Sequence, residues 1–137
     1  MSKKIVFMGT SNFAVPILKS LYQNGYEISV VYTQPPKKSN RGQKLNKSPV
    51  HLFSENISLD VRHPQSLKNN NEEESFLTDL KPDIILVVSY GQIIPKNLLK
   101  APRFLYKHGD GASVQDETKT YSSRMNPPPS GLDLGAF

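Results

Sequence analysis

The sequence predicts an α/β protein in which helices cover both faces of an open, mostly parallel sheet. Short apolar runs rich in β-branched residues alternate along the chain with segments whose apolar residues recur at helical spacing. The runs at residues 4–8 and 84–88 contain no alternating polar positions, which is typical of strands buried on both faces. Strands joined by helices pair in parallel through right-handed crossovers, so an open, Rossmann-like sheet is the expected arrangement.

The first half of the chain gives two strands and two helices. The first strand ends at Gly9, and Pro16 suits the first turn of a helix because its missing N–H would have no partner there. A second strand is expected within residues 26–33. The pair Ser48-Pro49 has the form of a helix cap followed by proline, which predicts the start of a second helix.

The second half is expected to add a short strand at residues 57–61 and a third helix. This helix begins near the amide-rich and then acidic residues 69–74, and it ends before Pro82. Residues 84–88 form the last strand that the sequence predicts. The chain is therefore divided into a domain at residues 1–103 and a divergent, loosely ordered tail at residues 104–137. Without a further strand, residues 84–88 would form an exposed apolar edge unless residues 104–108 pair with them.

Composition narrows the classes of protein and site. The chain has 137 residues, enough for one domain, and it contains no cysteine and three scattered histidines, so we expect neither disulfides nor a metal site. There is no signal peptide or apolar run long enough to span a membrane, which predicts a cytoplasmic protein without a membrane partner. The loop after Gly9 lacks the further glycines of a dinucleotide fingerprint and reads otherwise as a tight turn.

The net charge of +5 is concentrated in one segment. Five cations and no acidic residue lie between residues 34 and 51, namely Lys37, Lys38, Arg41, Lys44 and Lys47. Such a cluster favours a polyanion partner, with nucleic acid the leading candidate, and a solvated basic loop is the alternative.

Three motif blocks, in one order along residues 1–103, resemble the methionyl-tRNA formyltransferase family. They are Ile5-Val-Phe-Met-Gly-Thr10 with Phe13-Ala-Val-Pro16, Asn40-Arg-Gly-Gln-Lys-Leu45 with Ser48-Pro-Val50, and Lys81-Pro-Asp83 with Tyr90-Gly-Gln-Ile-Ile-Pro95. The resemblance implies a Rossmann-like formyltransferase domain, here incomplete. It also implies formyl transfer from 10-formyltetrahydrofolate to the methionyl amino group of initiator tRNA, a step of translation initiation.

The resemblance also assigns binding residues. Folate would bind the segment made of Ser89, Tyr90, Gly91, Gln92, Ile93, Ile94 and Pro95. Its backbone can present N–H and C=O groups to a flat pterin ring, and the two isoleucines can cover the ring's face. The tRNA acceptor stem would contact Arg41, Gly42 and Lys44.

The catalytic residues depart from the family pattern. The reaction needs a group that stabilises an oxyanion and a base that takes a proton from the amine. The family supplies an Asn-x-His motif and a later Asp. In this chain Tyr106 stands in the asparagine's place, His108 falls near the histidine, and Asp133 lies in a Gly-Leu-Asp-Leu-Gly context. His108 and Asp133 are the candidate catalytic residues, although a lone tail histidine and a turn aspartate are commonly just solvated.

We therefore expect a monomeric formyltransferase whose activity is weak or lost. The absence of the family's C-terminal tRNA-binding barrel and the altered tail suggest a truncated or frameshifted product. One alternative is an inactive folate- or RNA-binding remnant. Another is a different folate-dependent formyltransferase of the same fold, against which the pair Arg41 and Lys44 argues.

Overall fold

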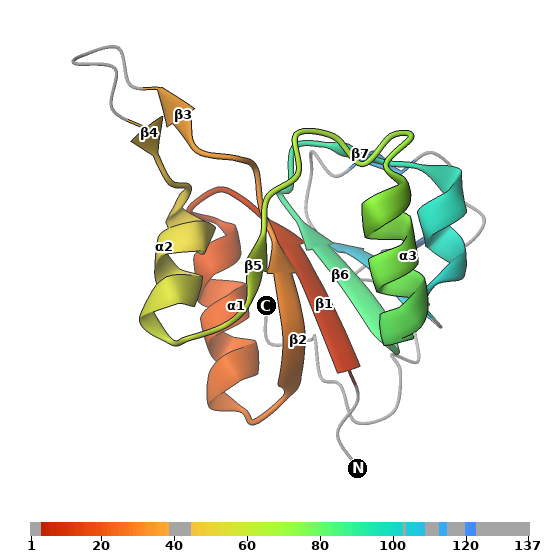
Figure 1. The fold of residues 1–137 in the computed structure, drawn as a ribbon. Coiled ribbons are helices and arrows are strands. Elements are labelled where there is room, and N and C mark those ends of the chain that lie inside the picture. Colours follow the sequence, from red (N-terminus) through yellow and green to blue (C-terminus); the bar gives the residue numbers. More distant parts are fainter. Residues whose placement is uncertain (1–3, 39–44, 103, 109–112, 115–119, 123–137) are drawn as a thin grey trace.

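The computed structural model describes residues 4–38, 45–102, 104–108, 113–114 and 120–122 (Figure 1). The elements of the first half are β1 (Lys4–Gly9), α1 (Ala14–Gln23), β2 (Glu27–Tyr32), β3 (Lys37–Lys38), β4 (Leu45–Asn46), α2 (Pro49–Asn56) and β5 (Val61–Arg62). Those of the second half are α3 (Asn71–Leu80), β6 (Ile84–Val88), β7 (Ile93–Ile94), the 3₁₀ helix η1 (Lys96–Lys100), β8 (Phe104–His108), β9 (Ser113–Val114) and β10 (Thr120–Ser122).

The predicted open parallel sheet is confirmed. It has six strands in the order β10-β8-β6-β1-β2-β5, and each neighbouring pair is parallel. The chain runs outward from β1 through β2 to β5, and then returns to β6 on the other side of β1. The order of strands therefore reverses between β1 and β6, and this is where ligands bind in open α/β sheets.

The predicted placement of helices on both faces is also confirmed (Figure 1). Alternate side chains of each strand point to opposite faces. On one face Ile5 and Phe7 of β1 pack in a core with α1 and α2. On the other face Val6 and Met8 pack in a second core with α3 and η1. These four side chains of β1 are at most 1% exposed, so the strand is buried on both faces, as its sequence predicts.

Local signals place the helix ends close to where the sequence predicts them. Pro16 lies in the first turn of α1. The Ser48 hydroxyl accepts the His51 N–H at 3.0 Å and caps α2. The Asn70 side chain accepts the Glu73 N–H at 3.2 Å and caps the start of α3, and Lys81 caps its end in the left-handed conformation.

The third strand lies later than predicted. It was expected at residues 57–61 and is instead β5, Val61–Arg62. The intervening residues continue the turn that ends α2, because Ser58 takes a φ of 60° and the Leu59 N–H donates to the Ser54 carbonyl at 2.9 Å. The basic segment also contains an antiparallel hairpin, β3–β4, that the sequence did not predict.

The prediction that no strand follows residues 84–88 was wrong. β8 pairs with β6 along its whole length, from Ile84↔Phe104 to Val88↔His108, and β10 pairs with β8. Leu105 is 1% exposed in the core shared with α3. β8 therefore covers the edge of β6 that was expected to be exposed. The composition of residues 104–108 only weakly indicates a strand, and pairing with β6 and burial of Leu105 stabilise it there.

Candidate functional site

The candidate site lies at the carboxyl ends of β1 and β6, where the order of strands reverses. Thr10, directly after β1, is bonded to the turn that follows β6. Its N–H donates to the Ser89 carbonyl at 3.1 Å, and its hydroxyl donates to the Tyr90 carbonyl at 2.6 Å. The two strand ends therefore form one connected unit.

The turn at residues 89–91 has an unusual backbone. Ser89 has a φ of 50° and Gly91 a φ of 91°, so both lie in the left-handed region. A Cβ atom on Gly91 would come within 2.8 Å of the Gln34 amide nitrogen, so a larger residue here would displace the Gln34 side chain. Tyr90 between them is fully buried, and burial raises the pKa of its hydroxyl above the ordinary value.

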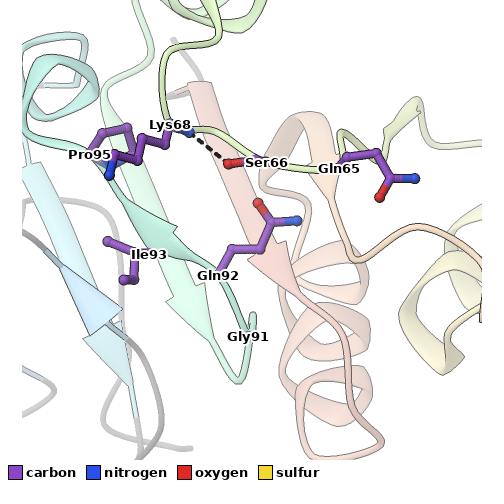
Figure 2. Close-up of a pocket in the computed structure, with 7 residues that line it drawn as sticks. All are labelled: Gln65, Ser66, Lys68, Gly91, Gln92, Ile93 and Pro95. Atoms are coloured by element: carbon purple, nitrogen blue, oxygen red, sulfur yellow. Dashed lines mark hydrogen bonds between the residues drawn. The ribbon is translucent and has the colours of Figure 1, made fainter.

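A cleft of about 380 Å³ opens beside this turn (Figure 2). Two segments line it, one following β5 and the other following β6. The lining residues are Gln65, Ser66 and Lys68 on the first segment and Gly91, Gln92, Ile93 and Pro95 on the second. The volume is in the range of small-molecule pockets, which runs from about 300 to 1,000 Å³.

A second hollow, of about 330 Å³, also borders Gly91. It is lined by Thr10, Ser11, Gln34, Lys37, Ser89, Tyr90 and Gly91. Gly91 lines both spaces, so the two hollows meet at this turn. Lys37 gives the second hollow a positive charge.

Two glutamine side chains connect the strand ends. Gln34, two residues after β2, donates from Nε2 to the Gly91 carbonyl at 2.8 Å. Gln92 donates from Nε2 to Gln34 Oε1 and to the Pro64 carbonyl, both at 2.9 Å. Gln92 Oε1 is buried and has no hydrogen-bond partner among the described residues, which is uncommon for a buried polar atom.

The sequence-predicted folate residues, 89–95, come together along this turn and cleft. Ile93 is 62% exposed, whereas Ile94 is fully buried in the core with α3. The expectation that both isoleucine side chains cover a ring therefore has to be corrected. Successive residues of a strand point to opposite sides, so only one of the two can face the cleft.

His108 lies at the same edge of the sheet as this turn. Its backbone is in register with Val88, and Val88 is in register with Gly9. Tyr106 is in register with Leu86, two residues further from the strand ends. The other candidate catalytic residue, Asp133, lies outside the described residues.

The predicted tRNA-binding residues Arg41, Gly42 and Lys44 also lie outside the described residues. The structure describes the two strands on either side of them. β3 and β4 pair with Lys37↔Asn46 and Lys38↔Leu45, and this hairpin extends away from the sheet (Figure 1). Both lysine side chains are exposed.

A buried polar network on the α3 face was missed by the sequence reasoning. Glu73 is 5% exposed and accepts hydrogen bonds from the Tyr32 hydroxyl at 2.5 Å and from Arg62 Nε and Nη2 at 2.7 and 3.1 Å. Burial raises the pKa of Glu73, but these bonds outweigh burial and hold the pKa below its ordinary value. The hydrogen bond to Glu73 raises the pKa of Arg62, and burial raises the pKa of the Tyr32 hydroxyl.

Glu73 looked in sequence like one of three acidic residues at a helix N-terminus. The available signal was its spacing, because Glu73 and Leu77 are four residues apart and share the buried side of α3. Gln34 was likewise missed, since its partners are distant in the chain. In the part of the chain that the structure describes, no three metal-ligating side chains gather, and no helix has the length and apolarity needed to cross a membrane.

Comparison with known proteins identifies relatives. Residues 3–109 match the family model described as "Formyl transferase". The chain is 61% identical over 99 residues to the methionyl-tRNA formyltransferase of Pelagibacter ubique, covering 72% of this chain and 32% of that protein. The enzymes of the same name from Sphingopyxis alaskensis and Ruegeria pomeroyi are 47% and 45% identical over 100 residues, with 73% of this chain covered in each case and 32% and 33% of the relative. The chain thus spans about a third of the length of these curated relatives.

Proposed function

The chain belongs to the formyl transferase family, and from this premise we propose that it transfers a formyl group from 10-formyltetrahydrofolate to the methionyl amino group of initiator tRNA. The observation that carries the proposal is the cleft at Gly91, Gln92, Ile93 and Pro95. It lies where the order of strands reverses, and it is built from the segment that resembles the family's folate-binding motif. The protein would act in the cytoplasm, as a monomer, in translation initiation.

The residues of the cleft fit a folate. Gly91 lets the Gln34 amide approach the turn closely, and Gln92 contributes a polar side chain to the lining of the cleft. The exposed side chain of Ile93 offers an apolar surface for the flat ring. When bound, the donor supplies the formyl carbon that the methionine amine attacks. The roles of Ser89, Tyr90, Ile94 and Pro95 are then to shape the turn that presents these three residues.

We assign the remaining steps to residues near the strand ends. His108 would take the proton from the attacking amine, which its register beside Val88 supports. Asp133 would assist it. Arg41, Gly42 and Lys44 would contact the acceptor stem. The exposed lysines of the hairpin strand β3 support this role, since they bring further positive charge to the base of the same loop.

A second candidate function is folate binding without efficient turnover. The observation that favours it is Tyr106, which stands where the resemblance expects an asparagine. A single-turnover formylation assay with charged initiator tRNA separates the two functions. Formylation that disappears in His108→Ala supports the enzyme, whereas folate binding with no formylation supports the second candidate. Absence of both would overturn both.

Binding of the donor is tested by a glycine pair. Gly91→Ala and Gly25→Ala both place a side chain at positive φ, at 91° and 83°, and both therefore strain the backbone by about 1 kcal/mol or more. Only the Gly91 variant also meets Gln34, because nothing lies within 4 Å of a Cβ on Gly25. Calorimetry with the stable isomer 5-formyltetrahydrofolate should show about tenfold or greater loss of affinity in Gly91→Ala alone. Equal affinities in the two variants would contradict the assigned cleft.

A further inference from the structure

All three carbonyl groups of the turn at residues 89–91 are held by two residues from other strand ends. Thr10 donates to the Ser89 carbonyl from its N–H and to the Tyr90 carbonyl from its hydroxyl. Gln34 donates to the Gly91 carbonyl from Nε2, and the Gln34 N–H donates to the Thr10 hydroxyl at 3.2 Å. The contacts form one connected set.

The orientation of both glutamine amides is fixed by the groups at the two ends of this chain of bonds. The carbonyls of Pro64 and Gly91 can only accept, so a nitrogen must face each of them. Gln92 therefore presents Nε2 to Pro64 and also to Gln34, and Gln34 must present Oε1 to Gln92. No alternative orientation of either amide satisfies all of these contacts.

The turn needs such support because it is strained. Ser89 is not glycine, yet its φ is 50°, a conformation that costs of order 1 kcal/mol or more and persists only when surrounding contacts impose it. Gly91 follows at a φ of 91°. A turn released from its contacts would relax toward negative φ, and the Gly91 carbonyl and the wall shared by the two hollows would move.

We propose that Gln34 is a positioning residue that holds the turn at residues 89–91 in the conformation that opens the cleft of Gly91, Gln92 and Ile93. Gln34 does not line that cleft and lies in the second hollow, so it acts through the Gly91 carbonyl and the Gln92 amide. The identity of the cleft's ligand as a folate rests on the proposed function, whereas the positioning itself does not.

The test uses a substitution that changes only the donor. Gln34→Glu keeps the size and the Oε1 acceptor, but it turns an oxygen toward the Gly91 carbonyl, where two acceptors repel. Gln23→Glu is the matched control, since it makes the same chemical change at an exposed residue of α1 that lines neither hollow. Lys37 lines the same hollow as Gln34 and can pair with the new carboxylate, so the neutral Gln34→Ala variant accompanies them.

Two readouts are measured on the whole chain. The first is amide hydrogen exchange of residues 89–95 without ligand, and the second is the Kd for 5-formyltetrahydrofolate. We expect exchange to accelerate and the Kd to rise about tenfold in both Gln34 variants, with both quantities unchanged in Gln23→Glu. If Gln34→Glu fails to fold, Gln34→Ala alone carries the comparison.

The two proposals fail in different ways. Unchanged exchange at residues 89–95 in folded Gln34 variants would overturn the positioning role, whatever the affinity for folate. If the unmodified chain binds no folate but exchange still accelerates in the Gln34 variants, the positioning role stands and the proposed function falls.

Discussion

Two polar networks connect distant parts of this molecule, and they are built on different principles. On the α3 face, Glu73 accepts bonds from Tyr32 and Arg62 with both of its oxygens. At the strand ends, Gln34 and Gln92 form a neutral chain of amides. The charged network is saturated, whereas the neutral one leaves Gln92 Oε1 buried without a partner among the described residues.

The charged network supports the fold, whereas the amide network shapes the candidate site. A buried carboxylate is tolerated when its lone pairs are used, and Arg62 gains a further contact by lying 4.0 Å from the centre of the Phe76 ring. The amide network instead positions the turn whose residues line the cleft. We therefore expect the charged network to govern stability and the amide network to govern affinity.

The largest expected effect is that of Glu73→Ala on stability. The change leaves the buried Tyr32 hydroxyl and the half-buried Arg62 without their acceptor, and it should lower the free energy of unfolding by about 3 kcal/mol. Urea denaturation measures this loss. The control is Glu72→Ala, an exposed residue of the same first helical turn, which shares the favourable interaction with the helix dipole. A Glu73 variant that folds, but loses donor affinity as strongly as Gln34→Glu, would break the separation of the two networks.

A smaller effect is expected from acid. The folded-state pKa of Glu73 lies below its ordinary value of 4.5, so the unfolded chain binds this proton more readily. The stabilisation from Glu73 is therefore fully present above about pH 4.5 and is lost as pH falls through the folded-state pKa. Urea midpoints measured at intervals between pH 3 and 7 should fall more steeply for the unmodified chain than for Glu73→Ala. Parallel curves would show that the carboxylate is not held in its charged form by Arg62 and Tyr32.

The smallest effect on stability is expected at an exposed ion pair, whose charges are not buried. Lys47 Nζ lies 2.8 Å from Glu55 Oε2, with side-chain exposures of 43% and 45%. Water and salt screen such a pair, so Lys47→Ala should leave the urea midpoint unchanged within error at physiological ionic strength. A clear loss of stability there would mean that charge matters in this protein even where it is not buried.

Local chemistry predicted much of the fold. Ser48-Pro49 indicated the start of α2 because an N-cap and a proline act within one helical turn. Residues 84–88 indicated β6 because five consecutive apolar, mostly β-branched residues are typical of a strand buried on both faces. β8 was not predicted, since its pairing with β6 and the burial of Leu105 are tertiary effects on a short, mixed sequence.

The candidate site was predictable in part for the same reason. Gly91 and Gln92 belong to a motif of contiguous residues, and that motif lines the cleft. The contribution of Gln34 depends on partners 57 and 58 residues away, and no local pattern reports such bonds. The sequence did not indicate that Ile93 is exposed and Ile94 is buried, because this depends on which side of β7 faces the core.

The position of β1 in the sheet has a consequence for the time order of folding. β1 lies between β2 and β6, and contacts such as that from the Lys4 N–H to the Asp83 carboxylate join residues 79 positions apart. Among the described strands β1 is synthesised before the others and lies in the middle of the sheet, so one of its edges stays unpaired until β6 has been synthesised. Such long-range parallel pairing slows folding and leaves the apolar edge open to mispairing. The nascent chain should therefore depend on chaperones most during the interval between synthesis of β2 and synthesis of β6.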